Sequence, residues 1–584
     1  MHVKLYDSAS GTRIRLGFQD EAVSSVFELF TPEGDSMVGR EEGAVLDPRP
    51  MYGFKIAGLR PFRVPMINKA PRISENTSSS RALRWTREML QKCALDHREC
   101  LHRYEDALLP TMVLDLGTSA PALEQDLKLY RSQAESAPYV CLSHCWGGSG
   151  WMKTTTLNIK EHLNEIAFKS LPRTFRDAVT FTRGLRIRYL WIDSLCIVQD
   201  DLEDWRRESG NMCTIYHGSS LTLAASMASN NDGGCFYSHA SMNERGHKLK
   251  IDHPEYEQSE IYLRECIDHD IVIKAAPLLS RAWVYQERLL SPRYLHFGNA
   301  ELVWECAEGI SCECGFCECQ GGRMTYANTL HANKLPLGPR GSVSVRPSSA
   351  VRLRRWHKLV SDYSALALTY PSDRLPAISG LAKHSLEPQG AEYLAGLWED
   401  GLPLDLLWYT AHPSRRSQEW RAPTWSWASI DSPIGFISMR KDDASNHCAI
   451  IQAECTPLGP DSFGEVSSGC ITLSGHLVPA ILRASPLRTD EAREREQEVK
   501  PNLEIPSPCH VIETHFDWLW PAEQACTPYQ PVHYLAIASN SMIQYGLVLS
   551  CVDATTKAFE RIGIATVRKS GMLLQGEPTE LRIV

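Results

Sequence analysis

The sequence predicts an α/β domain with a mostly parallel sheet, followed by a β-rich C-terminal region. Two observations predict this class. Between residues 138 and 240, short apolar runs such as YVCLS (139–143) and RYLWID (188–193) alternate with amphipathic helical patterns. Strands that alternate with helices form parallel sheets whose faces the helices cover. Beyond about residue 420 the pattern changes to closely spaced β segments such as CITLSGHLV (470–478).

The remaining elements follow from local patterns. Residues 2–17 alternate around a Ser-Gly turn and predict a hairpin, and residues 81–104 show helical periodicity. Helices at 171–185 and 201–217 and a strand at 220–226 complete the alternating region. The predicted organisation is a hairpin and linker at 1–80, a helical lead-in at 81–137, the α/β domain at 138–305, a Cys-, Gly-, Pro- and Ser-rich loop at 306–350, and a helical then β-rich region at 351–584.

Length and composition limit the function. A chain of 584 residues is expected to form two or three domains. The net charge of −9 disfavours nucleic acid as the main partner, because phosphate binding needs a positive surface. No apolar run reaches the roughly 18 residues of a membrane span, and the first residues lack a signal-peptide pattern. We therefore expect a cytoplasmic protein without a membrane span, whose 19 Cys are free thiols or metal ligands.

Several blocks of sequence share their order and their Trp-rich composition with one known family. Three of them form the core: YVCLSHCWG (139–147), the long stretch LPRTFRDAV to LTLAAS (171–226), and RAWVYQERLLSPR (281–293) followed by LHFGNAELVWEC (295–306). Three shorter ones follow: DRLPAISGLA (373–382), YLAGLW (393–398) and APTWSWAS (422–429). Together they resemble the heterokaryon incompatibility (HET) domain proteins of fungi over roughly residues 81–430.

The resemblance implies a regulator of self/non-self recognition and programmed cell death, with a protein partner or self-association as its trigger. It also implies a TIR-like, flavodoxin-like sheet. An accessory role in a secondary-metabolite pathway is a further alternative, since such genes also occur there. We expect the three core blocks to meet as neighbours around one open sheet.

An enzymatic alternative follows from the same resemblance. Some TIR domains cleave NAD with a glutamate on a helix that follows a loop, and Glu208 occupies the analogous place here, after SLCIVQDD. The glutamate would stabilise positive charge on the ribose, with NAD as substrate. The structural alternative is that Glu208 lies at the polar edge of its helix and pairs with an arginine such as Arg183. No G-x-G-x-x-G or P-loop motif occurs, which disfavours Rossmann and P-loop functions, and the lack of a G-x-S-x-G motif disfavours Ser/His/Asp catalysis.

Candidate ligand-binding residues follow the predicted strands. Open α/β sheets bind ligands beyond the carboxyl ends of their strands. The candidates there are Ser143, Trp146, Gly147, Asp193 and Asp200. The aspartates are alternatively helix caps or loop anchors, and the glycine alternatively serves a tight turn.

The third block contributes two more candidates. Trp283 and Arg288 lie in a dense polar and aromatic stretch, RAWVYQER (281–288). They either clamp a ligand or belong to a buried Arg–Glu network that fixes the domain.

Two groups of Cys and His suggest zinc. Cys93, His97 and Cys100 lie at positions i, i+4 and i+7 of the predicted helix and would share one of its sides. Three ligands are one short of a closed zinc site, so the fourth must come from elsewhere, for example from the later Cys cluster. That cluster has five Cys within residues 306–319, and Cys314 and Cys317 have C-x-x-C spacing. The alternatives are buried thiols or a redox-labile loop.

Overall fold

The computed structural model describes most of the chain from residue 73 onward. The described residues are 73–97, 100, 107–117, 124–148, 152–238, 269, 273, 275–315, 348–386, 390–414, 416–417, 419–439, 445–484, 498–499, 501–505, 510–521, 530–568 and 577–584, with the backbone of six short strands at 4–6, 12–15, 27–30, 55–56, 247–249 and 261–265. The chain divides into two compact units. The first comprises residues 1–198, 216–279 and 291–340, and the second comprises 199–215, 280–290 and 341–584.

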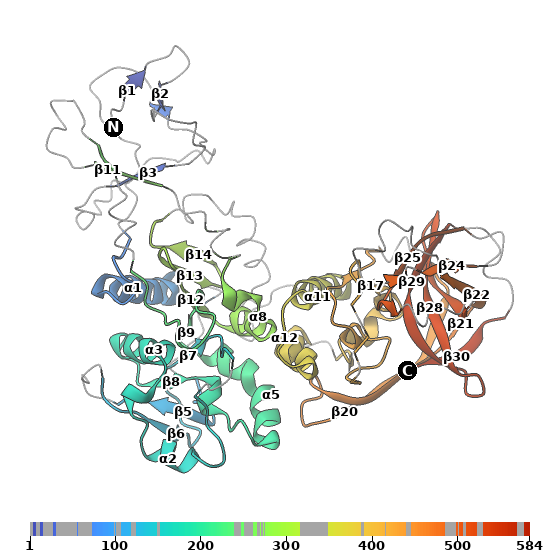
Figure 1. Cartoon of the computed structure of the whole chain (residues 1–584), viewed down its shortest axis with the longest axis horizontal. Helices are drawn as coiled ribbons and strands as arrows, with labels where there is room; N and C mark the ends of the chain where they lie inside the picture. Colours follow the sequence, from blue (N-terminus) through green and yellow to red (C-terminus); the bar gives the residue numbers. More distant parts are fainter. Residues whose placement is uncertain are drawn as a thin grey trace. The chain divides into compact units, whose positions relative to one another are not determined.

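The first unit is built on an eight-stranded sheet with the order β14-β13-β12-β9-β7-β8-β5-β6 (Figure 1). The strands are β5 (Met112–Asp115), β6 (Lys128–Arg131), β7 (Tyr139–Ser143), β8 (Tyr189–Trp191), β9 (Leu221–Ala224), β12 (Arg293–Phe297), β13 (Leu302–Cys306) and β14 (Gly309–Cys312). The four central strands β12, β9, β7 and β8 are parallel, and the outer strands add to them in antiparallel pairs. The predicted mixed α/β architecture with a mostly parallel sheet is therefore confirmed.

The sheet is wider than the range 138–305 that the sequence predicted for the α/β domain. β5 and β6 lie in the predicted helical lead-in, and β14 lies in the predicted loop. β6 and β14 are partly exposed and form no continuous apolar run, whereas β5 (MVLD) is fully buried and its short apolar run falls in a region predicted as helical.

β7 occupies the middle of the sheet. All five of its residues are buried, and it pairs with β8 on one side and β9 on the other. In this register Ser143 lies opposite Ala224, so β7 and β9 end at the same edge. A strand that is buried on both faces reads as a continuous apolar run, which is why YVCLS was recognisable.

Helices pack against the sheet of the first unit. They are α1 (Ser80–Asp96), α2 (Ile159–Asn164), α3 (Arg173–Gly184) and the single turn α4 (Asp193–Cys196). Ser79 caps α1 by accepting a hydrogen bond from the amide of Ala82. α1 and α3 touch at Gly184, whose missing Cβ leaves room for Leu83 and whose carbonyl accepts from Arg87. Because α3 connects β7 to β8, its first turn lies at the edge where the parallel strands end.

The short strands near the N-terminus form two small sheets. β1 (Lys4–Tyr6) and β2 (Thr12–Arg15) are antiparallel, which confirms the predicted hairpin, and β4 (Lys55–Ile56) pairs with β2. β3 (Phe27–Phe30), β10 (His247–Leu249) and β11 (Ile261–Glu265) form the other sheet.

The second unit contains helices followed by a large, mainly antiparallel sheet, which confirms the predicted β-rich C-terminal region. Its helices are most of α5 (Leu202–Gly218), α8 (Ala282–Leu290), α11 (Ser349–Ser364) and α12 (Pro376–Leu386). The main path of the sheet is β20 (Cys448–Pro457), β21 (Val466–Gly475), β30 (Thr579–Ile583), β29 (Ala558–Arg568), β28 (Ile543–Asp553), β27 (Gln530–Ser539), β22 (Leu477–Ala484) and β24 (Pro501–Glu504).

The three downstream blocks of sequence meet in the core of this second unit. The indole nitrogens of Trp356 and Trp427 both donate to the carbonyl of Gly396, each at 2.9 Å. Gly396 has a φ of 100°, and a Cβ there would meet the ring of Trp427 at 2.6 Å. The guanidinium of Arg374 lies over the same ring, 5.7 Å from its centroid. The Gly and Trp residues of these blocks therefore serve packing.

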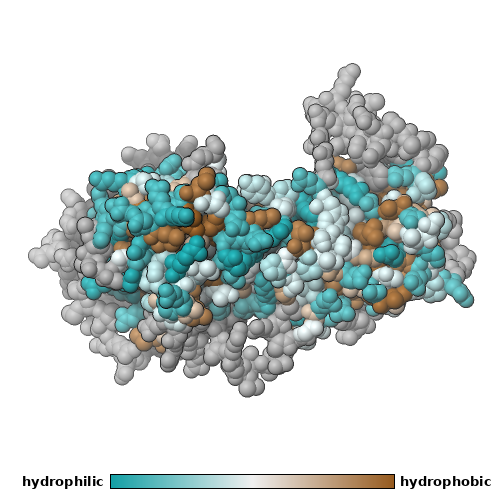
Figure 2. Space-filling view, turned by 90° about the horizontal axis from the view of Figure 1, so that it is seen from below, coloured by the Kyte–Doolittle hydropathy of each residue, from teal (hydrophilic) through white to brown (hydrophobic). Residues whose placement is uncertain are grey.

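The surface shows no continuous apolar face in the view of Figure 2, where apolar residues lie in small groups among hydrophilic ones. Among the described residues, no helix combines the length and the apolar character that a membrane crossing requires.

Candidate functional site

The loops after β7 and β8 are joined by Asp193. Its Oδ2 accepts a hydrogen bond from Nε1 of Trp146 at 2.8 Å, and its Oδ1 accepts from the amide of Ser194 at 2.7 Å. Nδ1 of His144 lies 3.7 Å from Oδ1. His144 is buried and its ring meets that of Phe175 edge-on. Asp193 therefore acts both as a helix-turn anchor and as the link between the two loops.

A second polar network runs behind this edge. The hydroxyl of Tyr294 on β12 donates to Oγ of Ser143 at 3.0 Å. Nδ1 of His296 lies 3.0 Å from Oγ of Ser226, and its Nε2 lies 3.3 Å from Glu305. This order resembles a nucleophile–base–acid relay, but all of these side chains are buried. In this conformation the network holds strands together and presents no nucleophile to a substrate.

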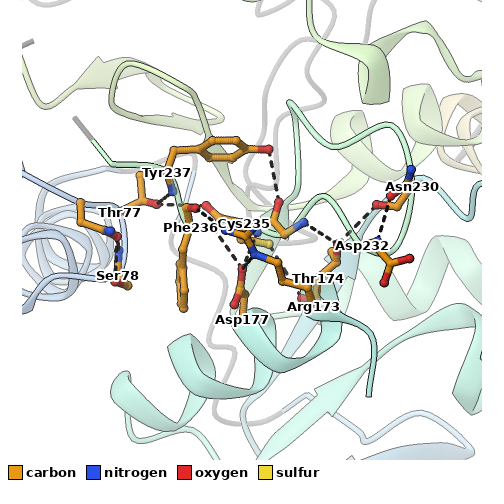
Figure 3. A network of polar contacts seen from close by, with 12 residues as sticks. Thr77, Ser78, Arg173, Thr174, Asp177, Asn230, Asp232, Cys235, Phe236 and Tyr237 are labelled. Carbon is orange, nitrogen blue, oxygen red and sulfur yellow. Dashed lines mark hydrogen bonds and ion pairs between the residues drawn. The ribbon is translucent and has the colours of Figure 1, made fainter. Parts of the chain in front are cut away.

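The first turn of α3 is covered by the loop that follows β9 (Figure 3). The amide of Thr174 donates to the carbonyl of Asn231 at 2.9 Å, and Oγ1 of Thr174 accepts from the amide of Gly234 at 3.0 Å. Asp177 accepts from the amides of Cys235 and Phe236 at 2.8 and 3.2 Å. Burial raises the pKa of Asp177. A helix N-terminus attracts anions, and here the chain's own loop occupies that position.

Gly147 closes the gap between the loops after β7 and β9. Its φ is 82°, a region that L residues avoid, and a Cβ there would lie 2.7 Å from the Cβ of Asn230. Both the turn and the close approach require glycine. The geometry of Gly147 therefore supports the alternative that this glycine serves a tight turn.

Glu208 lies on α5 in the second unit. Its side chain is 3% exposed, and one of its carboxylate oxygens lies 3.1 Å from Nε of Arg207. Arg207 also bonds Asp204. The predicted pairing with Arg183 is wrong, because Arg183 donates instead to the carbonyls of Leu116 and Gln125. The reason is that Arg183 emerges from α3 toward the β5–β6 connection, a tertiary arrangement the helix pattern does not contain.

Asp200 is exposed in the segment before α5. The cap of that helix is the next residue, Asp201, whose Oδ1 accepts from the amides of Glu203 and Asp204 at 3.0 and 3.1 Å.

Trp283 and Arg288 lie on α8, which is buried from Val284 to Leu290. The indole of Trp283 donates to Asp373 at 2.8 Å, and burial raises the pKa of Asp373 to about 6. α8 lies close to α12, because Gln286 accepts from the amide of Gly380 at 2.7 Å. These contacts give the third block a packing role within the second unit.

The candidate ligand-binding residues are thus divided between the units. The first unit brings together Ser143, Trp146, Gly147 and Asp193 at one edge of its sheet. The second unit contains Asp200, Glu208, Trp283 and Arg288. The strand at the end of the third block, β12, pairs with β9 and so joins the sheet of the first unit as expected.

One group of metal-ligating side chains forms between α1 and β13. The ligand atoms of Cys93, His97, Cys100 and Cys306 all lie within 4.8 Å of one another, so these residues could hold a metal ion. The expected shared helix side is wrong for Cys100, because α1 ends at Asp96 and a turn after the helix carries this residue. Cys306, at the end of β13, is the fourth member.

Hydrogen bonds among the three sulfurs favour a thiolate at one of them, Cys306. Hydrogen bonds from Cys100 and Cys93 hold the pKa of Cys306 well below its usual value, and the pKa of Cys100 is raised to about 11 by its bond to Cys306. Arg293 is fully buried beside them and donates to the carbonyl of Cys100 at 3.0 Å. The buried guanidinium balances negative charge on the sulfurs.

A second group consists of His269, Glu301, Cys312 and Cys314, all buried, with ligand atoms within 4.8 Å of one another. Cys314 is thus part of a cluster, but not through C-x-x-C spacing, and Cys317 lies outside the described residues. Burial opposes ionisation of His269, but its bonds to Cys312 and Glu301 raise its pKa to about 10.

Several of these residues escaped the sequence analysis. Tyr294 is one of them, although it lies directly between the two stretches of the third block. His269 and Glu301 had no signal, because their proximity depends on the fold.

The fold and this edge define an open, helix-covered α/β sheet whose loops at the carboxyl ends are bonded to one another. Residues 139–287, about a quarter of the chain, match the family model described as heterokaryon incompatibility protein (HET). The chain therefore carries a HET domain. No curated protein matched the chain. No solved structure matched it either.

We expect Gly147→Ala to destabilise the first unit by about 1–3 kcal/mol, the usual cost of placing a non-glycine residue at positive φ. Calorimetry of the full chain should show the first unit's transition shifted by about 2–4 °C for each kcal/mol. Gly148→Ala is the matched control, because nothing lies within 4 Å of a Cβ at Gly148. Equal melting of the two variants would contradict this account of Gly147.

Proposed function

We propose that this chain regulates incompatibility-type cell death in self/non-self recognition, with its HET domain acting as a signalling surface. The HET match itself suggests a function related to heterokaryon incompatibility. The observation that carries the proposal is the closed edge of the sheet: the loops after β7, β8 and β9 are bonded to one another and to the first turn of α3. Such an edge offers a fixed shape to a partner or to a second copy of the chain.

The order of the parallel strands supports a TIR-like, flavodoxin-like relationship. In chain order they lie second, first, third and fourth, β8-β7-β9-β12. This is the start of the flavodoxin-like order, in which the ligand crevice lies between the first and third strands. Gly147, after β7, and Asn230, after β9, approach each other closely in the corresponding region.

NAD cleavage is the alternative, and the contacts of Glu208 weigh against it. A catalytic carboxylate must face the ribose carbon, whereas Glu208 is 3% exposed and lies against Arg207. The first turn of α3 is a position where a helix can bind phosphate. Here the amide of Thr174 in that turn already donates to the carbonyl of Asn231. Nothing among the described residues favours the accessory role in a secondary-metabolite pathway.

Induced expression in a filamentous fungal host tests the proposal. Wild type and Glu208→Gln should both arrest growth, because neither needs a catalytic carboxylate. The control Glu203→Gln changes an exposed glutamate on the same helix. Asp193→Ala should no longer arrest growth, because it removes the hydrogen bond from Trp146 and the contact with His144 that join the loops after β7 and β8.

Normal growth with every version would refute the signalling function. In parallel, the purified full chain is incubated with NAD. If wild type and Glu203→Gln release nicotinamide and Glu208→Gln does not, the NAD-cleaving alternative is correct and the proposal of a non-catalytic signalling surface is refuted.

We also propose that Cys93, His97, Cys100 and Cys306 bind a zinc ion that fixes α1 to β13. Three Cys and one His form a common closed structural zinc site. The four ligand atoms already converge, and with three thiolates the site would have a net charge of about −1, next to the buried Arg293. The ion would replace the weak contact between Sγ of Cys306 and Nδ1 of His97, at 3.3 Å, with two strong bonds.

Cys306→Ser should lower the zinc content of the purified full chain by one ion and lower its melting temperature, because a structural ion stabilises the folded state. Plasma mass spectrometry measures the metal. Cys551→Ser, which changes an exposed thiol of the second unit, is the control and should keep the wild-type content. Unchanged zinc in Cys306→Ser would refute this site.

A further inference from the structure

The hairpin of β13 and β14 brings three potential ligands to its open end. Cys306 pairs with Gly309 at the turn, whereas Val303 pairs with Cys312 at the other end. Glu301 immediately precedes β13, and Cys314 follows β14 after one intervening residue. The register of the hairpin therefore places Glu301, Cys312 and Cys314 together.

The contacts of these side chains are short and fully enclosed. Oε2 of Glu301 accepts from the amide of Cys314 at 2.6 Å, and the sulfurs of Cys312 and Cys314 lie 3.2 Å apart. His269, from a distant part of the sequence, completes the group. Its Nε2 lies 2.6 Å from Oε1 of Glu301 and 3.6 Å from Sγ of Cys314. Each of the four residues is at most 3% exposed.

The donor set fits zinc, which binds Cys sulfur, His nitrogen and carboxylate oxygen in a tetrahedron. Bonds of about 2.0–2.3 Å place neighbouring ligand atoms roughly 3.3–3.8 Å apart. The distances from Cys314 to Cys312 and His269 are 3.2 and 3.6 Å, close to this range. The contact between His269 and Glu301 would open by less than about 1 Å.

We propose that His269, Glu301, Cys312 and Cys314 bind a second zinc ion, at the opposite end of the hairpin from Cys306. The four residues of β13 beyond Leu302 separate the two sites by roughly 13 Å, so they are independent mononuclear sites. β14 is the edge strand of the sheet. A zinc ion at each end would hold this edge hairpin to α1 on one side and to the segment of His269 on the other, protecting an edge that could otherwise pair with other chains.

Metal content tests the proposal independently of any cell-death activity. The full chain is purified under reductant, equilibrated with Zn²⁺, freed of unbound metal and measured by plasma mass spectrometry. Wild type should hold two zinc ions per chain. The double variant Cys312→Ser/Cys314→Ser should hold one, Cys306→Ser should hold one, and the combination of all three changes should hold none. Cys551→Ser, on an exposed thiol, should hold two.

Cobalt provides a readout that does not depend on the double variant folding. Co²⁺ bound to Cys306→Ser would occupy only the second site and should show thiolate charge-transfer and tetrahedral ligand-field bands, weaker than those of wild type. Glu301→Gln should release the second ion to a chelator that leaves wild type intact.

Three results would overturn the second site. They are a single zinc ion in wild type that survives Cys312→Ser/Cys314→Ser, the absence of cobalt bands in Cys306→Ser, and a non-reduced mass showing that Cys312 and Cys314 form a disulfide.

Discussion

The pairing of β7 with β8 and β9 is the constraint on which the HET domain depends. β7 is buried on both faces and hydrogen-bonded on both sides, so it fixes where its neighbours end. Because the three strands are parallel, the loops after them must leave the sheet at one edge. The residues 144–147, 192–193 and 225–238 are therefore neighbours for a topological reason, before any side chain interacts.

The side chains then close this edge. A hydrogen bond to a charged group contributes about 1.5–3 kcal/mol, and the bond from Trp146 to Asp193 joins two of the loops. The third loop is held by Thr174 and Asp177 of α3 and by the fit of Gly147 against Asn230. Polar groups that are partly buried and bonded to each other make a rigid surface. This rigid surface is the basis of the proposed signalling role.

The sequence contained the centre of the sheet but not its outer parts. β7 and β8 are continuous apolar runs, and α3 has a clear helical period. These patterns exist because the strands and one side of the helix are buried, so the sequence alone predicts them. β6 and β14 are partly exposed and carry no such pattern, whereas β5 is a short buried apolar run in a region predicted as helical.

The candidate site residues likewise fall into those that local patterns predict and those that only the fold brings together. Asp193 and Gly147 could be found because they follow recognisable strands. The partner of Trp283, by contrast, is Asp373, which is 90 residues away. Cys306 was within a recognised cluster, but His269 and Glu301 meet only in the folded chain. Local patterns predict elements, whereas contacts between distant segments need the fold.

Amide hydrogen exchange of the full chain, with and without NAD, tests the central claim most directly. If the carboxyl edge is closed by its own contacts, residues 194–196 and 233–237, whose amides donate hydrogen bonds there, exchange slowly in the free protein, and NAD leaves their exchange unchanged. Rapid exchange at these residues in the free chain, or strong protection of them by NAD, would contradict the account.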